Sequence, residues 1–554
     1  MPLQAEIEEL FAARFPRYAL SLPFWPCNEV SLRQNDQRWF RDLPLQQIEV
    51  LYLYGMGDGS AALDLSEWLQ EKGDRRLVFL EPQPERIVHF LRQPFAKKVL
   101  EQEQIEIFHL PAKREKSALI QELARSYPFR GVFIAPGPGL TSSERQAFRR
   151  TKLQLMRKTA LSHANYIDRL YSHIPLSNLL KNLPRMPAAF YVNHLKDAFR
   201  DIPMIICGAG PSLSDSIEAL RKLENRAIII GGGSAIAALT SQGIQPHFAV
   251  AIDPNPDEML RLKNSFAFET PFLFSTRLYP DSFATCNGPF GYLRSGMSGI
   301  AELWFEEALK LIDPLLGASL PSESLSVTTL CVSLAHHFGC NPIMFAGLDL
   351  AYTHHRRYAE GVMASAERGD EHLQPVDRHL QKRDRSGQPI QSAVRWVMEA
   401  SAISQFARRH KQMRWINCTS GGLVLPGMEN GPLDPMSPIF CREWDLRGRI
   451  HQAIRRFPMP ADSGSILAEK TAELSRSLDV VLSQLAILVQ NENSGKCALA
   501  EIEMKEELAY DILFFDIEKT LRKTERDLEV FWKLFQELAR HCKKAFRKEA
   551  EEVR

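Results

Sequence analysis

The residues best suited to chemistry lie between positions 349 and 358. Asp349 follows an expected strand, PIMFAG (342–347), and the segment after it carries Tyr352, His354, His355, Arg356, Arg357 and Tyr358. An imidazole with a pKa near 6.5 can remove a hydroxyl proton at neutral pH. We therefore expect His354 or His355 to be a general base, with Asp349 as a further candidate. Arg356, Arg357 or Tyr358 would hold a phosphate.

Two glycine-rich turns precede this segment. Gly208, Gly210, Pro211 and Ser212 follow the expected strand MIIC (204–207), and Gly231, Gly232, Gly233 and Ser234 close the strand AIIIGGG (227–233). Glycines let a backbone approach a phosphate closely, and free amides at a helix start favour an anion. We expect these eight residues to bind a nucleotide. The alternative is ordinary turn and cap chemistry.

Further polar groups follow two other strands. Asp253 and Asn255 end the strand at 247–257, and Asn417 and Thr419 begin the glycine turn of WINCTSGGLVLPG (415–427). They are candidates for contacts to a nucleotide or, at Asp253, to a metal. A rigid solvated turn is the alternative for Asp253 and Asn255. Residues 361–388 read as a long polar loop and a candidate lid.

These residues need parallel sheets to position them. Strands alternate with helices over 48–135 and again over 204–430, which predicts two Rossmann-like domains in an α/β protein. In the first, Gly55, Gly57 and Gly59 follow a strand and Glu81 ends the next one. That spacing fits a dinucleotide or S-adenosylmethionine site. We favour the other interpretation, a scaffold whose glycines only make a tight turn.

Composition excludes several function classes. Lys and Arg total 68 against 67 Asp and Glu, so a net charge of +1 disfavours a nucleic-acid binder. The nine cysteines form no C-x-x-C pair, which favours a reducing cytosol. Neither a membrane span nor a signal peptide is evident. We expect a cytoplasmic protein.

The chain divides into four expected regions: a Rossmann-like domain at 1–140, a helical connector at 141–200, a nucleotide-binding domain at 201–430 and a helical domain at 431–554. Apolar residues at helical spacing within 466–546 predict long amphipathic helices, with a turn at 491–495. These helices pack on the catalytic unit or offer a surface for an oligomeric partner.

The motifs together resemble a known family. Strand–GAGPSL–helix, GGGS, FAVAIDPNP, NPIMFAGLDLAYT and INCTSGGLVLPG occur here in the order found in motility-associated factor (Maf) glycosyltransferases, and LYLYGMGDGS resembles their N-terminal domain. The central domain resembles the 6-hydroxymethylpterin diphosphokinase MptE-like group. This resemblance implies a sialyltransferase-like central fold with GAGPSL and GGGS near the nucleotide. Small residues often follow D-L-A-Y-T in the family, whereas His354 to Arg357 stand here.

The resemblance also implies a function. The expected activity is transfer of a nonulosonic acid from a CMP-activated donor to a protein hydroxyl, with a flagellin-like acceptor and no cofactor. The alternative is an MptE-like pyrophosphotransfer from ATP, which would need Mg²⁺ on Asp253, Asp257 or Asp349. A non-catalytic nucleotide-binding scaffold is the third possibility.

Overall fold

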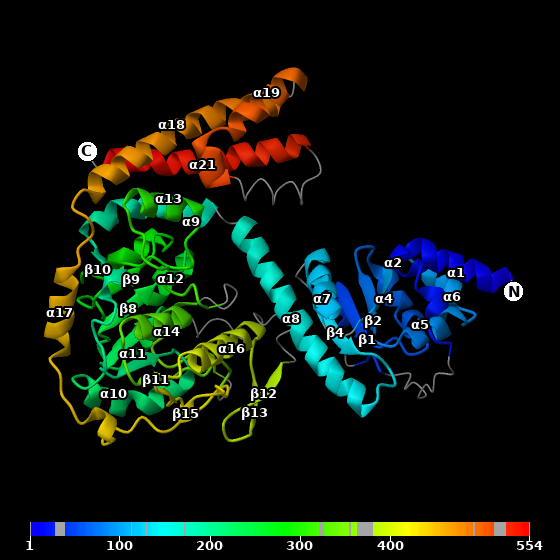
Figure 1. Ribbon diagram of the computed structural model, residues 1–554, viewed down its shortest axis with the longest axis horizontal. Helices are drawn as coiled ribbons and strands as arrows, with labels where there is room; N and C mark the ends of the chain where they lie inside the picture. The colour runs from blue at the N-terminus through cyan, green and yellow to red at the C-terminus, as the bar shows by residue number, and fades with distance from the viewer. Residues whose placement is uncertain are drawn as a thin grey trace. The chain divides into compact units, whose positions relative to one another are not determined.

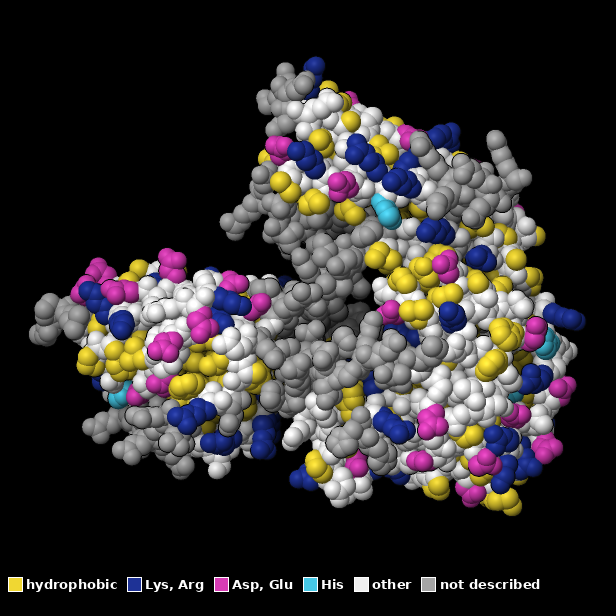
Figure 2. Space-filling model, turned by 180° about the vertical axis from the view of Figure 1, so that it is seen from behind, with side chains coloured by type: hydrophobic (Ala, Val, Ile, Leu, Met, Phe, Trp, Pro, Cys, Tyr) yellow, Lys and Arg dark blue, Asp and Glu magenta, His cyan; other side chains and the backbone are white. Residues whose placement is uncertain are grey.

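The computed structural model describes residues 2–27, 39–41, 43–111, 114–127, 131–170, 173–320, 326–353, 356–362, 380–490, 494–514 and 528–552. The described residues form two compact units, one of residues up to Ala164 and one of nearly all residues from Asn165 onward (Figure 1). Lys and Arg side chains are interspersed with Asp and Glu on the face of each unit in Figure 2, in keeping with the net charge of +1.

The first unit contains a four-stranded sheet in the order β3-β2-β1-β4, with every neighbouring pair parallel. The strands are β1 (Val50–Tyr54), β2 (Arg76–Glu81), β3 (Ile105–His109) and β4 (Val132–Pro136). The helices are α1 (Pro2–Arg14), α2 (Pro16–Ala19), α3 (Ala61–Asp64), α4 (Ser66–Glu71), α5 (Pro84–Leu91), α6 (Ala96–Leu100), α7 (Arg114–Ser126) and α8 (Ser142–Leu170), which runs on into the second unit. The expected Rossmann-like arrangement is confirmed.

The glycine turn of this unit serves the fold. Gly55, Gly57 and Gly59 all have positive φ, at 83°, 61° and 87°. Glu81 is fully buried and accepts hydrogen bonds from the amides of Met56 at 2.7 Å and Gln83 at 2.8 Å. Its carboxylate therefore ties two loops together inside the protein, which fits the scaffold interpretation.

The second unit contains a nine-stranded sheet in the order β15-β14-β11-β6-β7-β8-β9-β10-β5, in which all neighbouring strands are parallel. The strands are β5 (Phe190–Tyr191), β6 (Met204–Cys207), β7 (Ile228–Gly232), β8 (Phe248–Ala251), β9 (Phe272–Phe274), β10 (Phe290–Tyr292), β11 (Ile343–Ala346), β14 (Trp415–Asn417) and β15 (Glu429–Asn430).

Helices cover both faces of this sheet. They are α10 (Ile217–Leu223), α11 (Ser234–Thr240), α12 (Pro256–Leu262), α13 (Ile300–Ala308), α14 (Val327–His337), α16 (Val394–Arg409) and α17 (Leu446–Arg456). Successive strand residues point to opposite sides: Ile228 and Ile230 pack in one hydrophobic core with Leu330 of α14, whereas Ile229 packs in another with Leu220 of α10. A strand covered on both faces is apolar throughout, as MIIC and AIII are.

Part of the expected connector at 141–200 belongs to the second sheet. Its β5 is an edge strand of that sheet, and α9 (His173–Asn182) is anchored to it. Asn182 is fully buried and donates hydrogen bonds to the carbonyls of Thr276 at 2.9 Å and Leu278 at 2.7 Å. These strand residues were missed because a two-residue strand carries no periodicity.

The C-terminal region is helical, as expected. It contains α18 (Ser463–Gln490), α19 (Ser494–Lys505), a π-helical turn (Tyr510–Phe514) and α21 (Leu528–Glu552), and α18 lies beside α21 in Figure 1. Leu478 of α18 and Phe535 of α21 share a core with Leu180 of α9. Within the expected turn at 491–495, residues 491–493 lie outside the described part. No described helix combines the length and apolarity that a membrane crossing needs.

The expected polar loop at 361–388 is described only in part, because residues 363–379 lie outside the described ranges. Its last residues pair with those that follow. Strand β12 (Gln381–Arg383) forms an antiparallel hairpin with β13 (Pro389–Gln391), which leads into α16.

Candidate functional site

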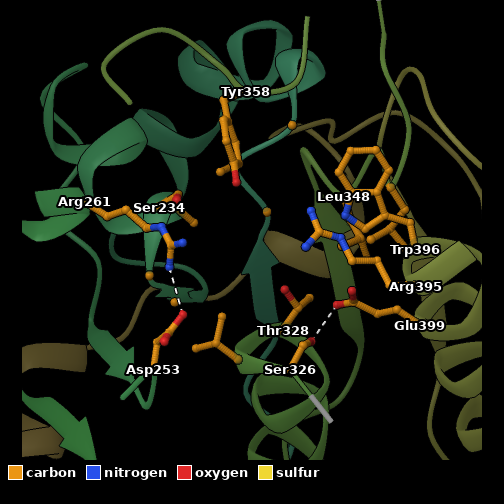
Figure 3. A pocket seen from close by; sticks show the side chains of 18 of the residues that line it. Ser234, Asp253, Arg261, Ser326, Thr328, Leu348, Tyr358, Arg395, Trp396 and Glu399 are labelled. Carbon is orange, nitrogen blue, oxygen red and sulfur yellow. Dashed lines mark hydrogen bonds and ion pairs between the residues drawn. The ribbon is translucent and has the colours of Figure 1, made fainter. Parts of the chain in front are cut away.

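A cavity of about 490 Å³ lies at the carboxyl ends of β6, β7, β8 and β11 (Figure 3). Ligands of open parallel sheets bind at this edge. Of the predicted site residues, those that line it are Gly208, Gly210, Gly232, Gly233, Ser234, Asp253, Asn255, Asp349, Arg357 and Tyr358. Pro211, Ser212, Gly231, Asn417 and Thr419 are not among the lining residues. The candidate bases His354 and His355 lie outside the described residues.

The backbone amides of the first glycine turn are hydrogen-bonded within the protein. The amide of Gly208 donates to the carbonyl of Ala346 at 2.8 Å, and that of Gly210 donates to the carbonyl of Gly347 at 2.8 Å. The Ser212 amide donates to Asp349 at 3.2 Å. The expectation that these amides are free for a phosphate is therefore wrong. The turn instead brings the ends of β6 and β11 into close contact.

Asp349 is the partner that holds this turn. Its side chain is buried and accepts hydrogen bonds from the amide and the hydroxyl of Ser212. Burial raises the pKa of Asp349, and hydrogen bonds from Ser212 and Thr353 oppose that shift. A Cβ at Gly210 would lie 2.4 Å from Asp349 Oδ1, so only glycine fits there. Asp349 thus lines the cavity while its carboxylate positions the turn.

The second glycine turn leads directly into α11. Gly233 has a φ of +51°, a conformation that favours glycine, and Ser234 is the first residue of the helix. A Cβ at Gly232 would lie 2.3 Å from a methyl group of Val327, so a glycine here leaves room for the start of α14. In the first turn of α11 the Ile236 amide donates to the Gly233 carbonyl at 3.1 Å.

Asp253 and Asn255 form a rigid corner on one wall of the cavity. Asp253 accepts hydrogen bonds from the Asn255 amide at 3.0 Å and side chain at 2.8 Å, and it pairs with Arg261 at 3.1 Å. Arg261 also contacts the buried Glu258 at 3.0 Å. Burial raises the pKa of Glu258 to about 7. Among the described side chains, no three His, Cys, Asp or Glu gather closely enough to hold a metal ion.

The opposite wall is cationic and aromatic. The Arg357 guanidinium lies 4.9 Å from the centre of the Tyr358 ring and 5.9 Å from that of Trp396, and Arg395 lies 5.4 Å from Trp396. Within the described ranges, neither arginine has a carboxylate at ion-pair distance, and Arg357 Nε is buried without a hydrogen-bond partner. Burial lowers the pKa of Arg357.

Residues of two helices complete this wall, and sequence reasoning missed them. Glu399 of α16 lines the cavity with Ser326 and Thr328 at the start of α14, and the Ser326 hydroxyl donates to Glu399 at 2.6 Å. Arg277 and Met297 also line it. Arg395 and Glu399 are one helical turn apart on α16. That spacing was the only available signal, and it is also typical of a solvated helix face.

Asn417 and Thr419 do not line the cavity and are fully buried. The Thr419 hydroxyl accepts a hydrogen bond from the Leu348 amide at 3.1 Å, and Asn417 Oδ1 accepts one from the Thr419 amide at 3.1 Å. These two side chains therefore hold the loop after β11 in place and do not contact the cavity.

The comparisons with known proteins agree with the resemblance stated above. Residues 177–355 match the family model described as 6-hydroxymethylpterin diphosphokinase MptE-like. No curated protein matches the chain. Among solved structures, the MAf glycosyltransferase from Magnetospirillum magneticum AMB-1 is similar over 99% of this chain and 96% of that one, with 14% identity and a TM-score of 0.47. That score is too low to support an argument about function. The predicted resemblance of the central residues to the MptE-like family is confirmed.

Proposed function

We propose that the protein is a glycosyltransferase that uses a nucleotide-activated sugar. The observation that carries this proposal is the uncompensated Arg357 guanidinium beside two aromatic side chains in a cavity at the sheet edge. A partly buried cation with no carboxylate at ion-pair distance among the described residues favours an anionic ligand, and aromatic rings suit a base or sugar face. The cavity volume of about 490 Å³ lies in the range of small-molecule sites.

In this reaction an acceptor hydroxyl attacks the anomeric carbon of the donor. The new C–O bond forms as the bond to the nucleotide phosphate breaks, and the nucleotide leaves with the electron pair. In this proposal Arg357 and Arg395, which line the cavity, stabilise the negative charge that develops on the phosphate. The proton of the acceptor goes to a general base, for which His354 and His355 remain our candidates.

The finer assignment rests on the family resemblance. We propose a CMP-linked nonulosonic acid as donor and a serine or threonine of a flagellin-like protein as acceptor, in the cytoplasm. The long C-terminal helices α18 and α21 are the proposed surface for an oligomeric partner.

Isothermal titration calorimetry with CMP, CDP, UDP, GDP and ATP, each with and without Mg²⁺, tests the proposal. We expect one pyrimidine nucleotide to bind in EDTA. The Arg357→Met variant should lose most of that affinity, whereas Gly57→Val in the first unit should retain it. Failure of every nucleotide to bind would refute the proposal.

The second candidate function is ATP-dependent pyrophosphotransfer, which the description of the matching family model favours. It would require Mg²⁺ at carboxylates. Asp253 is held by Arg261, and Asp349 by Ser212, so both would have to exchange partners to bind the ion. Binding of ATP that depends strictly on Mg²⁺ and is lost in Asp253→Asn would establish this candidate over the transferase.

A further inference from the structure

A carboxylate on the cationic wall of the cavity has no assigned role. Glu399 projects from α16 toward Ser326 and Thr328 at the start of α14, and Figure 3 shows all three at the same end of the cavity. The Ser326 hydroxyl donates to Glu399 Oε1 at 2.6 Å, and Thr328 supplies a second hydroxyl contact. Burial raises the pKa of Glu399.

The surroundings of Glu399 select what it can bind. In the described part of the chain no Lys or Arg lies within ion-pair distance of it. An ionised carboxylate has about four acceptor sites, and the two hydroxyls leave capacity on the cavity side. A phosphate would be repelled by this charge. A cationic ligand would be repelled by Arg395, which lies one helical turn away and also lines the cavity. The ligand groups that fit beside Glu399 are therefore neutral hydroxyl donors.

We propose that Glu399 binds a pair of hydroxyl groups of the ligand, either those of the nucleotide ribose or those of the transferred sugar. The inference rests on the proposed function, because it assumes a ligand with both parts. It divides the wall into two sites. Arg357 and Arg395 receive the phosphate, and Glu399 with Ser326 and Thr328 receives the hydroxyls.

A supporting role for α14 is the competing explanation. Ser326 caps that helix by accepting a hydrogen bond from the Thr329 amide at 3.1 Å, and Glu399 orients the Ser326 hydroxyl. If that were its whole function, Glu399→Gln and Ser326→Ala would lower the unfolding temperature alike and leave ligand selectivity unchanged. Ligand selectivity therefore separates the two explanations.

The experiment is calorimetry on the full chain with the tightest-binding nucleotide of the panel and its 2′-deoxy counterpart. A second arm compares UDP-glucose with UDP and CMP-N-acetylneuraminate with CMP. Wild type, Glu399→Gln and the exposed control Glu443→Gln are measured in parallel. Circular dichroism confirms that each variant is folded.

A hydrogen bond to a charged group corresponds to a preference of about tenfold or more. We expect the wild type and Glu443→Gln to prefer the ribonucleotide, or the sugar-bearing nucleotide, by that factor, and Glu399→Gln to lose that preference. The arm that changes identifies the source of the hydroxyls. Equal selectivity in all three proteins would overturn the inference while leaving nucleotide binding intact. Absence of any nucleotide binding would overturn the proposed function together with it.

Discussion

Replacing Arg357 by methionine separates ligand binding from folding, because the two should respond differently. The guanidinium lines the cavity with no carboxylate partner among the described residues. If it contacts the nucleotide phosphate, its loss removes a charged hydrogen bond worth about 1.5–3 kcal/mol. The dissociation constant should therefore rise by about 10- to 150-fold.

The stability of the free protein should change little. Methionine keeps an apolar contact with the rings of Tyr358 and Trp396, but the cation–π contribution of about 0.5–1 kcal/mol is lost. Against this, the variant no longer holds an unpaired cation in a partly buried place, and burial lowers the pKa of Arg357, as expected for an unfavourable environment. We expect an unfolding temperature close to or above that of the wild type.

The chain offers a matched control in the preceding residue. Arg356 is exposed, pairs with Glu360 at 3.7 Å and does not line the cavity. Arg356→Met should therefore change the dissociation constant by less than about twofold, since an exposed pair contributes little. Calorimetry and thermal unfolding of both variants provide the data. Equal losses of affinity at the two positions would refute the reasoning, as would an Arg357→Met variant that binds nucleotide like the wild type.

Three further predictions concern folding and catalysis. Burial lowers the pKa of His247 from 6.5 to about 4, so the neutral ring favours the folded state fully above pH 6.5. The free energy of unfolding should therefore fall by roughly 3 kcal/mol as the pH falls from 6.5 to 4. Denaturant unfolding of His247→Gln should show a smaller change in this free energy over the same pH range. Gly208→Ala places a Cβ 2.4 Å from the Gly347 carbonyl and should cost about 1–3 kcal/mol, whereas Gly431→Ala, with no heavy atom within 4 Å, should unfold like the wild type. If His354 or His355 is the base, its alanine variant should lose about 10²-fold in rate with nucleotide affinity intact; two variants of normal turnover would exclude histidine.

The sequence predicted the two parallel sheets because strands alternate with helices, and because some strands, such as MIIC and AIII, are short, apolar and followed by glycine turns. MIIC and AIII leave no polar residue for a solvated face, so each had to lie between two layers of helices. The edge strand at Phe190–Tyr191 was not predictable, because its place depends on the neighbouring strand β10. The pairing of α9 with the C-terminal helices depends in the same way on partners distant in sequence.

The candidate site was predictable only where it is built from loops at strand ends. Asp253, Ser234 and Asp349 each lie within three residues of a strand end, so the sheet places them at one edge. Trp396 and the charged residues of α16 follow a hairpin and start a helix of 16 residues, and their periodicity was equally consistent with solvent exposure. What brings them to the cavity is the packing of α16 against α14, which the linear sequence does not reveal.

The GAGPSL motif therefore serves the fold, and the ligand site depends on other residues than the sequence led us to expect. Gly208 and Gly347 approach so closely that a Cβ on Gly347, whose φ is +64°, would lie 2.8 Å from the Gly208 carbonyl oxygen. The GAGPSL turn consequently fixes the distance between β6 and β11 and, through Ser212, the position of Asp349. A ligand phosphate would then depend more on side chains such as Arg357 than on the amides of that turn. Glycine substitutions in the turn should accordingly act first on stability, and only substitutions on the cationic wall should act on affinity alone.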